Sequence, residues 1–392
     1  MAEKILFQNA TIIDGTGNDP IKGSLLIDGS DILEVGNVTC EDARSIDLSG
    51  KTIMPGIINA HAHITFEANA DPVSQIMRES DASIALRAQR NLMRQLRSGV
   101  TFLRDMGAPK YIDIDVRNAR NQGLIYGPEF ICAGRPITMT GGHIWVLGRE
   151  CDGLDEVRKG VREQLRAGAD LIKIIATGGV LTPGVEPGAP QLNYDEICVA
   201  VEEANKAGKK TATHAQGSTG IMNAVRAGIN SVEHGFFLTD EIIELMIEKG
   251  TYLVPTFFAV HAIYDGGVAS GIPAQAVAKV EKAMHPHAES FKKAYKAGVK
   301  MAMGPDSGTP LCLHTAPTYE LTLMVQNGMS TKDAIVAATK NGADLLGILD
   351  RYGTLEQGKA ADFLVLDADP LADISALQTN LESVYKLGKL VN

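Results

Sequence analysis

The middle of the chain alternates between amphipathic segments with the helical period and short apolar runs typical of buried strands. The helical pattern covers about 82–98, 154–167 and 195–207, among other segments. Most helical segments end at a glycine that an apolar run follows directly, as in Gly99-Val-Thr-Phe-Leu and Gly250-Thr-Tyr-Leu-Val. Because glycine adopts the left-handed conformation at helix ends without steric cost, we interpret each unit as helix, glycine turn and strand.

Eight apolar runs are predicted to be strands of one sheet. They lie at about 56–63, 100–105, 129–134, 171–176, 211–216, 231–236, 252–258 and 299–305. Alternation of strands and helices at this spacing predicts parallel strands joined by right-handed crossovers. Eight units favour a closed (β/α)8 TIM barrel over an open doubly wound sheet, which usually has fewer strands. The segment 266–297 is longer than one strand-to-strand crossover needs and is predicted to contain an extra helix, the helical excursion.

The two ends of the chain show a different pattern, with short alternating runs separated by turn signals. We therefore predict an α/β protein with a barrel over 55–352 and a small β-sandwich domain built from both termini, 1–54 and 353–392. A length of 392 residues accommodates both, since such a barrel takes about 250 residues.

Composition and charge narrow the class of protein. The net charge is −10, from 37 Lys and Arg against 47 Asp and Glu, so we expect no nucleic-acid and no membrane partner. No window approaches the roughly 20 apolar residues that span a bilayer, and the N-terminus is typical of a strand and turn rather than a signal peptide. Five scattered cysteines without a CxxC pair favour a reducing, cytoplasmic location over a disulfide framework or a thiolate metal site.

Candidate chemistry begins with His61 and His63, which close the first predicted strand and would share one of its faces. Later predicted strands end near Lys173, His214, His234 and Asp306. In barrels of this kind, catalytic groups lie at the C-terminal ends of the strands. Each residue alone has an ordinary explanation: a single histidine is most often a hydrogen-bonded polar residue, and Asp306 could form a turn or cap a helix. Lys173 is harder to explain, because lysine is almost never fully buried without a partner.

Imidazole and carboxylate ligands suit zinc and neighbouring divalent ions. Two such ions about 3.5–4 Å apart would polarise an amide carbonyl and lower the pKa of a shared water to about 7. A nearby carboxylate would take the proton of that water and return it to the leaving nitrogen. The convergence of these side chains at one rim therefore predicts a metal-dependent hydrolase.

Several segments resemble the amidohydrolase superfamily of binuclear metal hydrolases. They are Pro55-Gly-Ile-Ile-Asn-Ala-His-Ala-His, Leu171-Ile-Lys-Ile-Ile-Ala-Thr-Gly-Gly, Thr213-His-Ala-Gln, Val232-Glu-His-Gly and Gly304-Pro-Asp-Ser-Gly. The chain is similar to the imidazolonepropionase-related branch, which includes Xaa-Pro and Xaa-Arg dipeptidases and ochratoxin hydrolases. The segment from Gly353 to Asp367 resembles the family's returning β segment, so the resemblance covers essentially the whole chain.

The resemblance implies two divalent metal ions, with Zn²⁺ as the expected metal. Its ligand sets would be His61, His63 and Asp306 for one ion, and His214 and His234 for the other. Lys173 would take up carbon dioxide and bridge both ions as a carbamate, which turns a costly buried cation into an anionic ligand. Relatives of this branch are often homo-oligomers, so we expect the same here.

The resemblance also implies catalytic roles. Asp306 would double as the proton shuttle, and His143, in Thr140-Gly-Gly-His, would polarise the substrate carbonyl or stabilise the oxyanion, with a loop-capping role as the alternative. Candidates for the wall of the substrate pocket are His261 and Tyr264, for which packing is an equal explanation, and Trp145, just past His143. The paired histidines of the helical excursion, His285 and His287, are interpreted as surface residues.

The leading hypothesis is a hydrolase of amide or peptide bonds in dipeptides or N-acyl amino acids, either dipeptidase-like or carboxypeptidase-like, with ochratoxin-type amides included. A mononuclear deaminase on the same barrel would want His-x-x-Glu after the fifth strand, and Gly217 occupies the glutamate position. A cyclic amide or lactone hydrolase could use the same metals. A scaffold without catalysis would have eroded ligands, yet all six are present.

Overall fold

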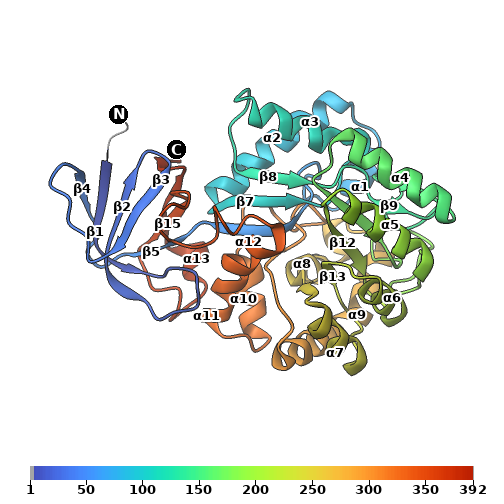
Figure 1. The fold of residues 1–392 in the computed structure, drawn as a ribbon. Helices are drawn as coiled ribbons and strands as arrows, with labels where there is room; N and C mark the ends of the chain where they lie inside the picture. Colours follow the sequence, from blue (N-terminus) through green and yellow to red (C-terminus); the bar gives the residue numbers. More distant parts are fainter. Residues whose placement is uncertain (1–3, 392) are drawn as a thin grey trace.

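The computed structural model describes residues 4–391 (Figure 1). Strands from both ends of the chain pair in one eight-stranded sheet beside the α/β part of the molecule. They are β1 (Lys4–Ile12), β2 (Ile21–Asp28), β3 (Asp31–Gly36), β4 (Arg44–Asp47), β5 (Thr52–Pro55), β15 (Phe363–Leu366), β16 (Leu381–Lys386) and β17 (Lys389–Leu390). The sheet branches at β1, which pairs with β2, β4 and β5. Hydrogen bonds therefore join all eight strands in one branched sheet, whereas the sequence predicted a sandwich. The exact domain limits stay a prediction.

Aromatic packing joins the two ends of the chain inside this sheet. The rings of Phe7 and Phe363 lie 5.0 Å apart, and those of Phe363 and Tyr385 stack at 4.5 Å. Strand β15 pairs antiparallel with β5 on one side and with β16 on the other. The C-terminal strands thus complete a core that the N-terminal strands alone would leave open to water.

The remaining strands are parallel, as predicted, and form two further sheets. One contains β6 (Ile57–Ala62), β7 (Val100–Asp105) and β8 (Glu129–Cys132); the other contains β10 (Arg149–Glu150), β9 (Ile137–Thr138), β11 (Leu171–Ile175), β12 (Lys210–Ala215), β13 (Ser231–His234) and β14 (Tyr252–Val254). Parallel bridges from Met301 to Leu253 and from Ser307 to Ala62 connect the two sheets at one end. At the other end the N–H of Asp170 donates to the carbonyl of Cys132 at 2.9 Å.

Helices surround these strands (Figure 1). Their bounds are α1 (Pro72–Ile76), α2 (Asp81–Arg97), α3 (Ile112–Asn121), α4 (Leu154–Ala167), α5 (Tyr194–Lys206), α6 (Ser218–Arg226), α7 (Asp240–Lys249), α8 (Phe257–Gly266), α9 (Ala274–Ala297), α10 (Tyr319–Gln326), α11 (Thr331–Ala338), α12 (Lys340–Leu346) and α13 (Ala376–Thr379), with short 3-10 turns at Pro109–Tyr111 and Val268–Ser270. The three helices given as examples are confirmed to within a residue at each end. The glycine turns are confirmed as well, with φ of +91° at Gly99 and +67° at Gly250.

Two predicted strands were wrong in extent. The strand expected over 252–258 stops at Val254, because Pro255 has no N–H for the ladder, and α8 begins two residues later. The segment expected as the eighth strand makes a single bridge at Met301 and then runs without a regular ladder through Gly304-Pro305. Gly304 allows a close approach there, since a β-carbon at this position would lie 2.8 Å from the backbone nitrogen of His61.

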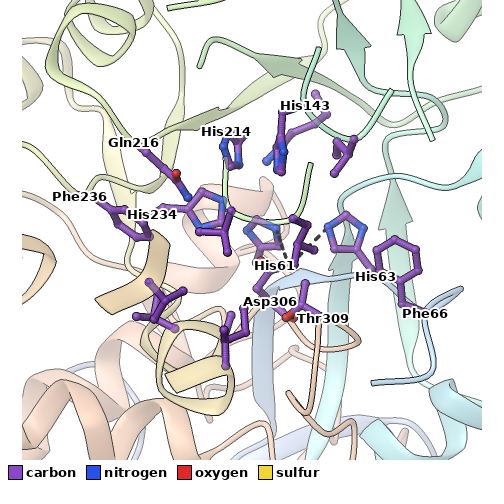
Figure 2. A pocket seen from close by; sticks show the side chains of 18 residues that line it. His61, His63, Phe66, His143, His214, Gln216, His234, Phe236, Asp306 and Thr309 are labelled. Carbon is purple, nitrogen blue, oxygen red and sulfur yellow. Dashed lines mark hydrogen bonds and ion pairs between the residues drawn. The ribbon is translucent and has the colours of Figure 1, made fainter. Parts of the chain in front are cut away.

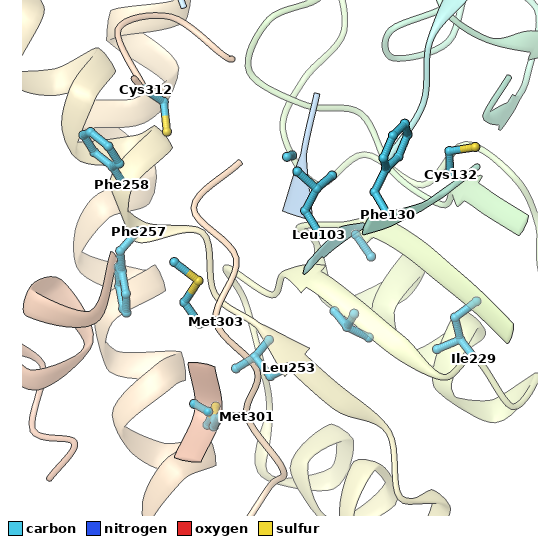
Figure 3. Packing of buried hydrophobic residues seen from close by; sticks show 14 of the residues in the cluster. Leu103, Phe130, Cys132, Ile229, Leu253, Phe257, Phe258, Met301, Met303 and Cys312 are labelled. Atoms are coloured by element: carbon cyan, nitrogen blue, oxygen red, sulfur yellow. The ribbon is translucent and has the colours of Figure 1, made fainter. Parts of the chain in front are cut away.

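A continuous apolar core holds the ends of the parallel strands in place. Figure 3 shows part of it, where Leu103 of β7 and Leu253 of β14 lie among side chains from helices and from the 301–303 segment. Protein interiors are close-packed, so the strand ends have little freedom to shift relative to one another. Within residues 4–391, no helix is both long enough and apolar enough to cross a bilayer.

Candidate metal centre

The predicted metal ligands from three separate segments meet in one buried cavity (Figure 2). Nε2 of His61 lies 3.3 Å from Oδ1 of Asp306, and Nε2 of His63 lies 3.5 Å from the same oxygen. One ligand atom each of His61, His234 and Asp306 lies within 4.8 Å of the other two. Strand β6, strand β13 and the segment after Met301 therefore deliver nitrogen and oxygen donors to one point.

The two other predicted ligands line the same cavity. The ring centroids of His214, on β12, and His234 lie 4.5 Å apart. Lys173, on β11, is 2% exposed, and its Nζ has no hydrogen-bond partner. A buried ammonium without a partner is costly, and a bridging carbamate between two cations would remove that cost. The donor set and this orphaned amine therefore fit a pair of divalent ions.

Burial decides the protonation of these groups. It lowers the pKa of His63 to about 4 and those of His214 and His234 well below the usual value, so the imidazoles are neutral at pH 7, as metal ligation requires. Burial alone would raise the pKa of Asp306, but the neighbouring His61, His63 and Lys173 outweigh it and keep the group ionised. Burial also lowers the pKa of Lys173 to about 8.

Hydrogen bonds to Nδ1 orient three of the imidazoles. His61 donates from Nδ1 to Oε2 of Glu233 at 2.8 Å, and His63 donates from Nδ1 to a backbone oxygen at 3.1 Å. His234 donates to Oγ1 of Thr256 at 2.7 Å, because the Thr256 hydroxyl gives its own proton to a backbone oxygen. In each ring Nε2 is left as a lone-pair donor, the arrangement in which metal-binding histidines are usually found.

His214 differs from the other three histidines. Its Nε2 lies 3.2 Å from the backbone oxygen of Gly178 and donates a proton to it. Ligation through this nitrogen would require the 178–180 loop to release the ring. The assignment of His214 as a ligand therefore stays a prediction.

Glu233 contacts a candidate ligand, His61, and was not assigned from the sequence. It is fully buried between His61 and Arg104, whose guanidinium donates to Oε1 at 2.9 Å. Burial alone would raise the pKa of Glu233, but Arg104 and His61 outweigh burial and lower the pKa to about 2, so Glu233 is a carboxylate. The sequence feature that could have identified Glu233 is the one used for Lys173, namely an ionisable residue inside an apolar run predicted to be a buried strand. Strict strand alternation would place Glu233 and His234 on opposite faces, but φ at His234 is +73° and breaks the alternation.

Strained backbone is concentrated around the cavity. His234, Thr256 and Asp306 have φ of +73°, +59° and +64°, and Ile144 has +49°. Non-glycine residues rarely adopt this region, least of all β-branched ones such as Thr256 and Ile144. Strain of this kind costs about 1–3 kcal/mol per residue and is found mostly where function requires a particular geometry.

His143 lies in the same cavity, with its ring centroid 4.3 Å from that of His214. Burial lowers its pKa to about 3, so the ring is neutral. Oγ1 of Thr182 accepts the N–H of Ile144 at 3.0 Å and lies 3.0 Å from Nδ1 of His143. Thr182 thus holds Nδ1 of His143, and in the tautomer whose Nδ1 accepts the Thr182 hydroxyl proton the ring proton lies on Nε2.

The cavity itself is small, about 50 Å³, and mostly apolar. Its apolar wall includes Phe66, Val180, Phe236, Val260, Ile263 and Val280. Gln216 is an additional polar candidate, because its buried Oε1 has no hydrogen-bond partner. The sequence analysis quoted Gln216 within the strand-five motif without giving it a role.

The proposed pocket residues lie elsewhere. Tyr264 and Trp145 are 46% and 43% exposed, and neither they nor His261 line the cavity. Helix α8 instead presents Val260 and Ile263, which share a face at helical spacing. The roles of His261, Tyr264 and Trp145 as substrate contacts stay predictions.

The two histidines of α9 have different environments. His285 is exposed, as predicted, but His287 is 1% exposed and stacks on Phe257 at 4.4 Å. The surface interpretation of His287 was therefore wrong, because residues two apart on a helix face different directions.

Parallel strands with histidines, a lysine and an aspartate gathered at their ends are typical of the amidohydrolases. The chain belongs to the amidohydrolase family, whose model matches residues 52–391. It is 31% identical to the ochratoxinase of Aspergillus niger over 417 aligned residues, which cover 97% of this chain and 85% of that one.

Two solved structures are similar over nearly their whole length. A Xaa-Pro dipeptidase with methionine bound in its active site has a TM-score of 0.90 at 33% identity, with 99% of each chain covered. A prolidase complexed with N-methylphosphonate-L-proline has a TM-score of 0.91 at 30% identity, again with 99% of each chain covered. The family resemblance expected from the motifs is confirmed, and the protein is a hydrolase that acts on amide bonds.

Proposed function

We propose that this protein is a binuclear metal-dependent hydrolase of dipeptides or N-acyl amino acids. The observation that carries the proposal is the convergence of His61, His63, His234 and Asp306 on one buried point beside the unpartnered amine of Lys173. The ochratoxinase, the Xaa-Pro dipeptidase and the prolidase among its relatives support an amide substrate.

We also propose that the two parallel sheets are parts of one closed (β/α)8 barrel. The bridges at Met301 and Ser307 and the hydrogen bond from Asp170 to Cys132 support closure at both junctions. A closed barrel gathers the strand ends around a single mouth, which explains how segments far apart in the sequence reach one site.

The residues present fit two metal ions. His61, His63 and Asp306 would hold one, His214 and His234 the other, and Lys173 would bridge them as a carbamate. Bound divalent ions, expected to be Zn²⁺, would polarise the substrate carbonyl and activate a water. Uptake of carbon dioxide needs the neutral amine of Lys173, and a pKa of about 8 leaves a usable fraction of it near pH 7.

The protein's own residues then move the protons. The Asp306 carboxylate accepts the proton of the attacking water and delivers it to the amide nitrogen as the C–N bond breaks. His143 donates its Nε2 proton as a hydrogen bond to the substrate carbonyl oxygen, where negative charge develops. The apolar wall keeps bulk water away from both groups.

Thr182→Val tests the role of His143. We expect kcat to fall at least about tenfold with little change in KM, because the ring would no longer be held with its proton on Nε2. Thr182→Ser keeps the hydroxyl and should retain most of kcat. Steady-state kinetics of the three proteins measure this, and a Thr182→Val enzyme with unchanged kcat would remove the assigned hydrogen-bond donor.

The deaminase alternative is opposed by the structure as well as by the motif. A β-carbon at Gly217 would lie 2.0 Å from the carbonyl oxygen of Gly188, so no glutamate fits at that position. Cyclic amides and lactones need the same centre and are therefore included as substrates in the test. Homo-oligomeric assembly and a cytoplasmic location stay predictions.

The test is a screen of the zinc-loaded protein against dipeptides and N-acyl amino acids, with lactones, cyclic amides and aminopurines as comparison sets. Release of free amino acids measures amide hydrolysis. Elemental analysis should find about two equivalents of tightly bound metal. Metal-free protein after zinc loading, or turnover restricted to aminopurines, would contradict the proposal.

A further inference from the structure

A larger groove of about 370 Å³ lies next to the metal centre and has no role in the chemistry described above. Its lining is mixed: apolar residues include Met77, Trp145, Val146, Leu181, Pro183 and Pro273, and polar residues are Asp71, Ser74, Thr182 and Gln275. These apolar residues come from the end of α1, the loop after β9, the loop after β11 and the start of α9. The first three segments follow strand ends, where barrel enzymes build their substrate sites.

The groove and the metal-centre cavity share a wall. Ile144 and Leu181 line both of them. The hydrogen bond between His143, on the cavity side, and Thr182, on the groove side, crosses the same wall. Ile144 holds its place with a φ of +49°, a strained value for a β-branched residue. The wall is thus fixed to the residue that faces the reacting carbonyl.

Size and chemistry indicate what the groove holds. Small-molecule sites typically have volumes of about 300–1,000 Å³, so the cavity of about 50 Å³ is too small for a whole substrate, and the groove is large enough for a side chain. Trp145 is 43% exposed and Met77 is 59% exposed, which leaves apolar surface in water. Asp71 is the one charged residue in the described lining, so a carboxylate would be repelled.

Two other hollows of similar volume do not adjoin the metal centre. One of about 350 Å³ is lined by Glu241, Glu244, Glu248 and Arg226, and one of about 320 Å³ includes Glu67 and Arg94. Neither shares a lining residue with the metal-centre cavity. The wall shared with the metal-centre cavity and the cluster of large apolar side chains together single out the groove beside Trp145.

We propose that this groove is a specificity subsite that binds a large, uncharged, apolar side chain next to the scissile amide. The inference rests on the proposed function, since it assumes that the amide reacts at the metal centre. It names the substrate class as amides with a long aliphatic, thioether or aromatic group on one side of the bond. Substrates with only glycine there would lack this contact.

Trp145 is the one tryptophan in the chain, so its fluorescence reports on the groove without any turnover. We expect a saturable blue shift of the emission when N-acetyl-L-leucinamide or N-acetyl-L-phenylalaninamide is titrated into the zinc-loaded protein. N-acetylglycinamide should give no shift at the same concentrations. Met77→Glu, which places a charge in the groove, should abolish the shift, and Leu124→Glu, at another exposed apolar position, should preserve it.

Activity provides the second measurement. For dipeptides that hydrolyse, the kcat/KM ratio of a leucine to a glycine substrate should fall about tenfold in Trp145→Ala and stay unchanged in Leu124→Ala. Absence of a saturable shift in the wild-type protein, or an equal shift in Met77→Glu, would overturn the subsite. A normal shift without hydrolysis of any amide would instead contradict the proposed function alone.

Discussion

Asp306→Asn should lower kcat by about three to four orders of magnitude while the fold is retained, because the amide cannot accept the proton of the attacking water. The carboxylate contacts Nε2 of both His61 and His63, so it also helps to hold a metal ion in the proposed centre. Asparagine has nearly the same shape and leaves the backbone at this strained position in place. Steady-state kinetics and thermal unfolding of the variant measure the two effects separately.

Asp240→Asn is a matched control, because its side chain is 83% exposed and lies on α7 away from the cavity. It should turn over at the wild-type rate. Turnover near the wild-type rate in Asp306→Asn would remove its role as proton shuttle. A large drop in unfolding temperature would mean that the loss of activity reports on folding instead.

Lys173→Ala should reduce the bound metal well below two equivalents and reduce turnover in parallel. The carbamate that bridges the proposed ions needs this amine, and the cavity left by alanine can admit a short carboxylate in its place. We therefore expect acetate or propionate to restore part of both metal content and activity. Elemental analysis and kinetics with and without the acid provide the test, and full metal occupancy without any added acid would contradict the bridge.

The metal-free protein offers a further check on Lys173. Its pKa in the folded state is about 8, below the unfolded value of 10.5, because burial disfavours the ammonium. The unfolded chain then binds more protons between pH 8 and 10.5, so stability should rise with pH across that window, and the charged amine costs about 3 kcal/mol at pH 7. Lys173→Met keeps a side chain of similar volume without the charge. Chemical denaturation of this variant should show neither the loss of stability at pH 7 nor its increase between pH 8 and 10.5.

Parts of the site were open to prediction because they depend on local rules. His61 and His63 share a strand face through simple alternation, and Lys173 stands out as an ionisable residue in an apolar run. Glu233 carries the same signal as Lys173, yet alternation argues against its lying near His234. The left-handed backbone at His234 places both at the centre, and no local rule predicts that conformation for a histidine.

The strand expected over 252–258 shows the same limit in the fold. Its apolar run is typical of a strand, but the buried side chain of Glu320, 63 residues after Phe257, accepts the N–H groups of Phe257 and Phe258 and caps a helix there. That capping partner is visible only after the chain has folded. Helix α8 lines the metal-centre cavity with Val260 and Ile263, and the proposed substrate contacts of His261 and Tyr264 stay predictions.

Local sequence was enough to predict the order of helices and parallel strands, the glycine turns and the candidate ligands His61, His63 and Lys173, since these follow from periodicity and from residue chemistry within a few positions. Tertiary structure alone decided which nitrogen of each imidazole is free, how Glu233 and Thr182 orient their histidines, and that an apolar groove adjoins the centre. These features depend on contacts between segments far apart in the chain, whose relative positions are fixed by close packing of the common core.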